Sequence, residues 1–319
     1  MCDMRDGRSG GSDAKRTGGR YGRRRLPTIS VIICTRDRVK SLTATLLTLF
    51  QLDIADIPDF QLVIVDNGST DETGKRVLEM TKAAPFPVIY VYEHRPGLSV
   101  ARNRGIDVAT GALILFTDDD CLVTVEWAKT AADLFSDDLL KVIGGRVAPY
   151  DKNDLPLAIK TCPVREELTS IDRLFGFLHG ANMAFGRAVI DRLGKFDIRF
   201  GAGTYLQSCE DTEFVYRAVK AGIPVIYEPT LVIHHNHGRS GSKLWYRSVR
   251  GYSIGMGAMM MKYLMVGQTD LLKLIYWDFR SALHRWRGDS KEWRWALAKR
   301  GLFEGALRFV YSASWRCSK

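Results

Sequence analysis

Three consecutive aspartates, Asp118, Asp119 and Asp120, follow an apolar run at residues 112–116 of this 319-residue chain. Like charges about 4 Å apart repel by roughly 4 kcal/mol at an effective dielectric near 20, so a folded core gains nothing from this cluster. Carboxylates suit Mg²⁺ or Mn²⁺, which a protein commonly shares with the phosphates of a substrate. Since residues i and i+2 of an extended segment point the same way, we expect Asp118 and Asp120 to face one ion. The alternative is a solvated acidic turn before a helix around Trp127.

Polar residues follow two earlier apolar runs in the same way. Thr35 to Arg38 follow the run ISVIIC, and Asp66 to Asp71 follow the run LVIV. In open parallel sheets, ligands bind beyond the carboxyl ends of the strands. Three polar strand ends at one edge therefore predict a binding site there.

Two further groups of ionisable residues lie later in the chain. Glu210 and Asp211 open an expected helix, where the helix dipole favours acids, so simple capping is one interpretation of this pair. His234, His235 and His237 follow the last expected strand. They lack the Cys or Glu partners and the spacing of a structural zinc site, so we do not predict zinc here.

The elements that must position these residues alternate between strands and helices. Strands are expected at 29–34, 62–65, 88–92, 112–117, 142–147, 178–185, 225–227 and 231–234, and helices at 39–52, 98–109, 188–193 and 211–221. A further helix through Val77 and Met80 is expected after the N-cap residues at 69–72. Residues 151–173 read as a polar loop. Strands separated by short helices imply βαβ crossovers, and thus an α/β fold with a mostly parallel sheet.

Six stretches, in order, resemble the family 2 glycosyltransferases with the GT-A fold. They are ISVIICTRDR (29–38), VIVDNGSTD (63–71), GLSVARNRGI (97–106), ILFTDDDC (114–121), GANMAF (180–185) and CEDTEFVYRAVKAG (209–222). The resemblance covers roughly residues 28–240. It implies a Rossmann-like central sheet flanked by helices. It also implies an inverting enzyme of hexosyltransferase type that uses a metal-bound nucleotide-diphosphate sugar, which we expect to be a UDP-sugar.

The resemblance also implies roles for single residues that match the family motifs. Thr35, Arg38, Asp66, Arg102 and Asp118 would hold the nucleotide. Two of them have a plainer alternative, since Asp66 would also cap the turn that follows it and Arg102 would also suit a helix surface. Asp211 would be the general base toward the acceptor hydroxyl, and Glu210 would orient a loop or the acceptor.

The metal and sugar ligands are implied in the same way. Asp118 and Asp120 match the D-x-D motif that holds Mg²⁺ or Mn²⁺, although three adjacent aspartates leave its register ambiguous by one residue. The family often has a histidine after the last strand that reaches the metal or diphosphate, and His235 and His237 are both candidates. Asp119, Gly180 and Asn182 are expected near the donor sugar or the acceptor.

Net charge divides the chain of overall charge +10 into three parts. Residues 1–25 carry +5 and residues 238–319 carry +11, which leaves −6 for the body between them. We expect a disordered basic tail at 1–26 and a catalytic domain at 27–240, with a nucleotide-sugar half at 27–121 and an acceptor half at 122–240. A helical extension rich in basic residues and Trp is expected at 241–319.

The extension has two interpretations. Its basic residues and its tryptophans suit helices on an anionic membrane surface, and they also suit a helical subdomain that packs on the catalytic domain. No run of 18 uncharged apolar residues and no Q-x-x-R-W motif occurs, which disfavours a processive membrane-embedded synthase. With no signal peptide ahead of its six cysteines, we expect the protein in the cytoplasm, peripheral on the cytoplasmic face of the membrane.

Two rival functions account for part of the sequence. A sugar-phosphate nucleotidyltransferase would need the same nucleotide and metal, but a Gly-rich phosphate loop is expected after its first strand, and TRDR has no Gly. A non-catalytic nucleic-acid-binding protein would explain the basic ends but not the acidic body, so we expect no nucleic-acid partner. We expect a glycan or lipid-linked acceptor, in cell-envelope or exopolysaccharide synthesis.

Overall fold

A computed structural model describes residues 26–274 and 293–317. Its centre is one mixed sheet, built in the described part of the chain from β1 (Ile29–Thr35), β2 (Phe60–Asp66), β3 (Val88–Tyr92), β4 (Leu113–Asp118), β5 (Cys121–Val123), β6 (Val142–Pro149), β7 (Glu166–Glu167), β8 (Asn182–Gly186) and β9 (Val225–His235). The strand order is β3-β2-β1-β4-β8-β6-β9-β5, with β7 beside β9. Strands β3, β2, β1 and β4 are parallel, β8 is antiparallel to both its neighbours, and β6 and β9 are parallel. The expected α/β fold with a mostly parallel sheet is confirmed.

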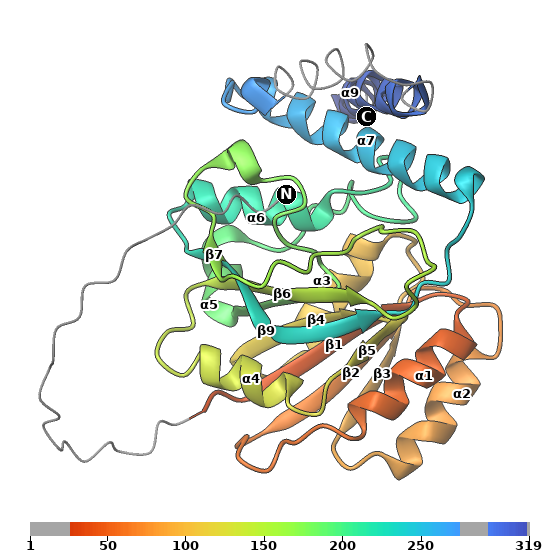
Figure 1. Cartoon of the computed structure of the whole chain (residues 1–319), viewed down its shortest axis with the longest axis vertical. Coiled ribbons are helices and arrows are strands. Elements are labelled where there is room, and N and C mark those ends of the chain that lie inside the picture. The colour runs from red at the N-terminus through yellow and green to blue at the C-terminus, as the bar shows by residue number, and fades with distance from the viewer. Residues whose placement is uncertain (1–25, 275–292, 318–319) are drawn as a thin grey trace, which may run out of the picture.

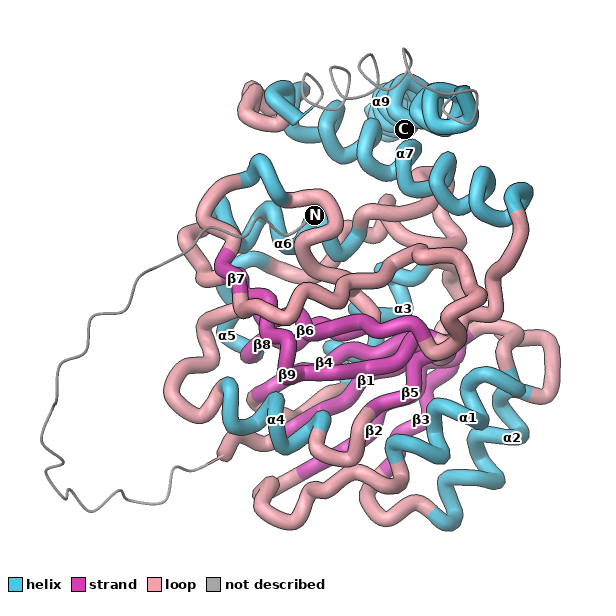
Figure 2. The backbone as a smooth tube through the Cα atoms, in the orientation of Figure 1, coloured by secondary structure: helices cyan, strands magenta, loops and turns pink. Residues whose placement is uncertain are grey.

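Helices cover both faces of this sheet (Figures 1 and 2). They are α1 (Val39–Leu49), α2 (Thr73–Met80), α3 (Leu98–Val108), α4 (Trp127–Leu134), α5 (Arg187–Leu193), α6 (Glu210–Lys220), α7 (Ser242–Leu264) and α9 (Trp293–Cys317). Strand β1 shows why both faces need cover, because Val31 and Ile33 pack in one apolar cluster and Ile32 packs in the other. A β-branched run buried on both faces is typical of the centre of a parallel sheet.

The register of the parallel strands sets the position of the site. Thr35 of β1 pairs with Asp66 of β2, and Cys34 pairs with Asp118 of β4. The polar residues that end these three strands thus lie at one edge of the sheet, as the sequence predicted.

Strand β7 lies within residues 151–173, which were predicted as a polar loop, and three further elements differ from the sequence prediction. Strand β5 was not predicted; it directly follows the aspartates and pairs Cys121 with His235 at the end of β9. Strand β8 begins at Asn182 rather than at residue 178, because the preceding residues form a turn in which the Asn182 N–H donates to the His179 carbonyl. The two predicted strands after residue 224 are one strand, β9, and a register shift between Gly145 and Arg146 of β6 maintains their pairing.

The two C-terminal helices pack closely on each other, and α7 also contacts α6. Side chains larger than hydrogen at Gly257 of α7 or Gly305 of α9 would overlap the backbone of the other helix. Lys262 and Tyr263 of α7 in turn donate hydrogen bonds to Glu213 of α6. In the described residues, the extension thus contacts the rest of the chain through α6, as the packing interpretation expects.

Some sequence predictions fall outside what the structure describes. The basic tail at residues 1–25 lies outside the described residues, as do Trp277 and Trp286 of the extension. Within the described ranges, no helix is long and apolar enough to cross a membrane.

Candidate active site

Counter-charges balance the aspartates at the end of β4. The Thr35 hydroxyl donates to Asp119 Oδ2 at 2.7 Å, and Arg38 Nε donates to Asp119 Oδ1 at 3.0 Å. Arg38 Nη2 also donates to Asp120 Oδ2 at 2.5 Å, and His235 Nε2 lies 3.2 Å from Asp120 Oδ1. Burial raises the pKa of Asp119 to about 7. For Asp120, His235 and Arg38 outweigh burial and hold the pKa well below its usual range.

Arg102 of α3 links Asp118, the first of the three aspartates, to the acidic pair of α6. Its guanidinium is buried, with Nη1 donating to Glu210 Oε1 at 2.9 Å and Nη2 lying 3.7 Å from Asp118 Oδ1. A Cβ at Gly180 would lie 2.5 Å from Nη2, so only glycine leaves room for the guanidinium there. The alternative that Arg102 is a surface residue is wrong.

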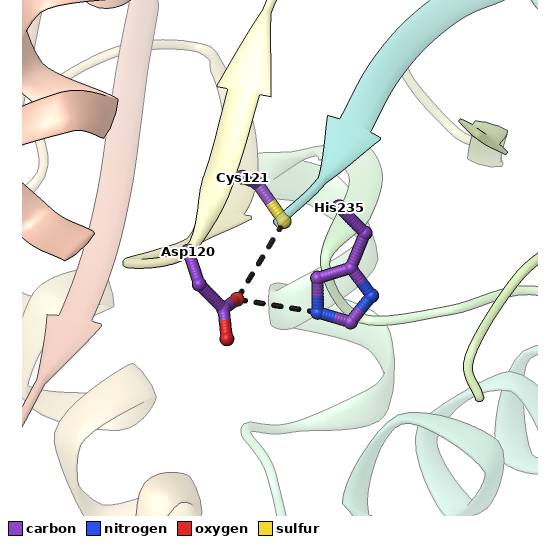
Figure 3. A group of neighbouring side chains, drawn as sticks. All are labelled: Asp120, Cys121 and His235. Carbon is purple, nitrogen blue, oxygen red and sulfur yellow. Dashed lines mark hydrogen bonds and ion pairs between the residues drawn. The ribbon is translucent and has the colours of Figure 1, made fainter. Parts of the chain in front are cut away.

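Asp120 and His235 form the best candidate for holding a metal ion (Figure 3). In the described part of the chain, one group of three potential ligands, Asp120, Cys121 and His235, has its ligand atoms within 4.8 Å of one another. Adjacent ligands of an octahedral ion, each at about 2.1 Å, are about 3 Å apart, which fits the 3.2 Å between Asp120 and His235. The other ring nitrogen of His235, Nδ1, is buried without a partner among the described residues, and an ion held by Nε2 and Asp120 would not reach it.

Cys121 fits this ion less well. Burial raises the pKa of its thiol well above the usual value, and sulfur is a poor ligand for Mg²⁺ or Mn²⁺. We therefore leave Cys121 out of the proposed ligand set.

The structure does not bring the other two predicted metal ligands into this group. His237 Nδ1 accepts from the Arg239 N–H at 2.9 Å, and its Nε2 lies 3.0 Å from the Leu155 carbonyl. With both ring nitrogens engaged by the backbone, His237 offers no free ligand atom. Asp118 lies outside the group, 36% exposed beside Arg102.

Glu210 and Asp211 occupy different environments in the first turn of α6. Asp211 is half-buried, and its carboxylate accepts from the Gly180 N–H at 2.8 Å and from the Thr212 N–H at 2.6 Å. Glu210 is buried against Arg102, and burial together with Asp211 raises its pKa to about 7. Asp211 is therefore the acid that an acceptor can reach.

Asp66 lies at the end of β2 and is nearly fully buried. Its Oδ1 accepts from the Ser69 N–H at 2.7 Å, and its Oδ2 accepts from the Tyr90 hydroxyl at 2.8 Å. Asp66 thus caps the turn that follows β2, as its alternative role predicts. Each of its carboxylate oxygens still has a lone pair for a nucleotide.

The polar atoms of Asn182 are all engaged within the fold and buried from a sugar. Its side-chain amide donates to the carbonyls of Arg146 and Leu231, and its oxygen accepts from Trp127 Nε1 at 3.0 Å. The residue is completely buried, and its partners lie on β6, β9 and α4. This environment is that of a structural residue, so we do not include Asn182 in the proposed site.

Sequence reasoning missed three residues of this region. Cys121 and Tyr90 occupy strand positions with no chemical signature of their own, so only the fold places them beside Asp120 and Asp66. His179 directly precedes Gly180; burial lowers its pKa, while the charge of Asp211 opposes that shift. Its position beside the GANMAF stretch was a signal that sequence reasoning did not use.

Solved structures of distant sequence share this fold. A mannosyltransferase from Pyrobaculum calidifontis, solved with GDP-Man and Mn²⁺, is 17% identical, with a TM-score of 0.60 over 90% of this chain and 88% of that one. TarS from S. aureus, in complex with UDP-GlcNAc, is 19% identical, with a TM-score of 0.51 over 85% of this chain and 79% of that one. These likenesses support the GT-A architecture.

Sequence comparison identifies the family. A glucosyl-dolichyl phosphate glucuronosyltransferase of Haloferax volcanii is 23% identical over 222 residues, covering 65% of this chain and 68% of that protein. Across the most similar relatives, the chain spans about a third to two thirds of their length. The family model described as glycosyl transferase family 2 matches residues 30–194, more than half of the chain. The chain belongs to the family 2 glycosyltransferases.

Proposed function

We propose that the chain is an inverting glycosyltransferase that moves a sugar from a nucleotide-diphosphate sugar to an acceptor hydroxyl. The observation that carries this proposal is the buried Arg102, which contacts Asp118 at the nucleotide edge and Glu210 beside Asp211. One residue thereby fixes the donor side and the base side of the site relative to each other. Positioning of this kind supplies much of the rate in a two-substrate transfer.

Asp120 and His235 are the residues that would hold a divalent ion in this reaction. When bound, the ion neutralises charge on the leaving diphosphate. Thr35, Arg38 and Asp66 lie along the same sheet edge and would hold the nucleotide. We expect a UDP-sugar; the complexes of similar fold with GDP-Man and with UDP-GlcNAc make both bases worth testing.

Asp211 would act as the general base. Its carboxylate takes the proton of the acceptor hydroxyl as that oxygen bonds to the anomeric carbon. The bond from the anomeric carbon to the diphosphate oxygen breaks, and its electron pair leaves with the nucleotide. The Gly180 N–H bond holds the carboxylate in place, while Glu210 stays with Arg102 as an orienting group. Attack opposite the leaving group inverts the anomeric centre.

The proposed roles can be separated by measuring binding and transfer in the same preparations. Calorimetry with UDP-sugars and GDP-sugars should show donor binding in Mn²⁺ or Mg²⁺ and little in EDTA. Asp120→Ala should lose the metal-dependent part of binding. Asp211→Asn should retain binding and lose transfer by about 10²–10⁴-fold, the usual contribution of a general base.

Asp191 provides the matched control, since it is an exposed aspartate on α5. Asp191→Asn should bind and transfer like the unmodified protein. Transfer at the normal rate by Asp211→Asn would overturn the base assignment. Equal donor affinity with and without metal would overturn the role of the ion.

We also propose that the C-terminal helices rest on an anionic membrane surface. Outward-facing Phe303, Leu307 and Val310 of α9 form an apolar stripe; Phe303 is 80% exposed and Leu307 is 71% exposed. Such residues at i, i+4 and i+7 lie on one helix face. The net charge of +11 over residues 238–319 complements anionic headgroups, each well-placed Lys or Arg adding about 1 kcal/mol.

This placement fits an acceptor that is itself held at the membrane. We propose a glycan or lipid-linked acceptor in cell-envelope or exopolysaccharide synthesis, on the cytoplasmic face. The proposed units are a catalytic domain at 27–240, whose acceptor half is 122–240, and the extension at 241–319.

A further inference from the structure

The turn that leads into the acidic pair has a strained backbone. Gln207 and Cys209 have φ angles of 69° and 72°, in the left-handed region that residues with side chains rarely adopt. Each such residue costs on the order of 1–3 kcal/mol and persists only where its surroundings hold it. Glu210 and Asp211 follow directly. We call residues 207–209 the entry turn.

Helix α7 holds the entry turn at its middle residue. The Ser208 hydroxyl donates to the Gly251 carbonyl of α7 at 3.0 Å. One helical turn later, a Cβ at Gly255 would overlap Ser208 Oγ and lie 2.7 Å from its backbone carbonyl atoms. The helix therefore approaches the entry turn as closely as glycine permits.

A second attachment joins α7 to the helix that begins with the acidic pair. Lys262 Nζ donates to Glu213 Oε1 at 2.6 Å and to Asp197 Oδ2 at 2.9 Å. The Tyr263 hydroxyl donates to the same Glu213 oxygen at 2.6 Å, and Glu213 is completely buried. Breaking a buried ion pair is strongly unfavourable, so α6 and α7 are held in one relative position.

We propose that α7 is a positioning element for the proposed base, acting through Ser208 on the entry turn and through Lys262 on α6. The inference rests on the proposed role of Asp211 and extends it to a helix outside the matched family segment, residues 30–194. The carboxylate of Asp211 is fixed on its other side by the Gly180 N–H. A displacement of about 1 Å at a reacting group can cost 10²-fold in rate, so a shift of the entry turn should reach the chemistry.

Two glycines one turn apart on α7 allow a matched test. In Gly255→Ala the new methyl group meets the backbone of Ser208, so the entry turn must move. In Gly251→Ala it meets only the side-chain oxygen of Gln207, at 3.2 Å, and the carbonyl that binds Ser208 stays in place. Both substitutions give the same gain in helix propensity. We expect kcat for transfer to fall at least tenfold in Gly255→Ala and less than twofold in Gly251→Ala.

Donor affinity distinguishes a change in the position of the proposed base from a general loss of native structure. Calorimetric Kd for a UDP-sugar or GDP-sugar with Mn²⁺ should stay within twofold in both variants. Gly257→Ala is the second control, because its methyl group would overlap the Leu302 backbone of α9 and leave Ser208 untouched. It should loosen the helix pair and retain kcat at temperatures where the protein stays folded.

The outcomes that overturn the proposal are distinct. A normal kcat in Gly255→Ala would overturn it, and so would a fall of kcat in Gly257→Ala as large as that in Gly255→Ala. It would also be overturned if the fall of kcat in Gly255→Ala came with a matching loss of donor affinity. If Gly255→Ala fails to fold, Ser208→Ala provides the test, because it removes the hydrogen bond to Gly251 without a clash. This variant should lower kcat and leave donor Kd unchanged. An unchanged kcat in Ser208→Ala would also overturn the proposal. Full transfer by Asp211→Asn combined with a lowered kcat in Gly255→Ala would refute the base assignment and leave the positioning role standing.

Discussion

Arg102 shows how a single residue organises the site. Its guanidinium lies 5.5 Å from the ring centroids of Phe116 and Phe196, and it contacts carboxylates on two sides. The planar group can stack on rings and bind two acids together, which a lysine ammonium does poorly. The buried positive charge is thus matched by acids that the proposed reaction needs.

The pH dependence of stability should reveal the environment of Glu210. Its pKa rises from 4.5 to about 7, so the folded state binds the proton more tightly than the unfolded state. The stability that this proton contributes is complete below about pH 4.5 and is lost as the pH rises through about 7. The free energy of unfolding should therefore fall between pH 5 and pH 8 by on the order of 2 kcal/mol more in the unmodified protein than in Glu210→Gln.

Denaturant unfolding at the two pH values measures this difference directly. Groups far from Glu210 contribute equally to both proteins, so the difference between their slopes reports on Glu210 together with the charges that interact with it, Asp211 and Arg102. Identical slopes would mean that the carboxyl titrates normally in the folded protein.

At the scale of elements, sequence alone predicted what continuous patterns encode. The first four strands contain apolar runs, and the polar residues that end three of them, Thr35, Asp66 and the aspartates, are apparent from the sequence alone. Strand β5 was not predicted, because a strand of three residues is too short to show a periodic pattern. Its pairing with β9 places His235 next to Cys121 and therefore close to Asp120. The Arg102–Glu210 pair joins residues 108 apart in the chain, and one sequence holds no signal for such a contact.

Asn182 illustrates the opposite case, a motif residue whose environment is structural. Asn182→Leu would leave Trp127 Nε1 and two buried carbonyls without a partner, and each unmet group costs about 1–3 kcal/mol. We expect a clear fall in the denaturant midpoint and an unchanged donor Kd in the protein that remains folded. A weakened Kd at a temperature where the variant is fully folded would instead support the sugar contact predicted from the sequence.

At the scale of the whole molecule, an acidic body lies between basic ends. In Figure 1 the helix pair α7 and α9 lies along one end of the molecule, away from α1 and α2. The charge that favours an anionic surface is thus concentrated in a unit that also carries the exposed apolar stripe of α9.

Vesicle sedimentation should test the proposed membrane surface. We expect binding to vesicles that contain phosphatidylglycerol, weak binding to pure phosphatidylcholine, and loss of binding as salt rises. The double variant Phe303→Ser, Leu307→Ser should bind at least tenfold more weakly, because about 0.8 kcal/mol is lost for each buried methylene. Leu47→Ser on α1 removes an exposed leucine outside the C-terminal helices and should leave vesicle binding unchanged. Equal binding by the double variant would rule out the α9 stripe.

Two glycines of α7 connect the packing of α9 to the turn that precedes the acidic pair of α6. Gly257 of this helix contacts α9, and Gly255 contacts the turn before Glu210. Two equilibria that share one rigid helix are coupled, and such coupling is reciprocal. If a bilayer favours the packed position of α7, it should raise kcat for transfer, and any ligand that itself favours this position should tighten the hold on the bilayer. The enzyme would then work fastest where its acceptor is found.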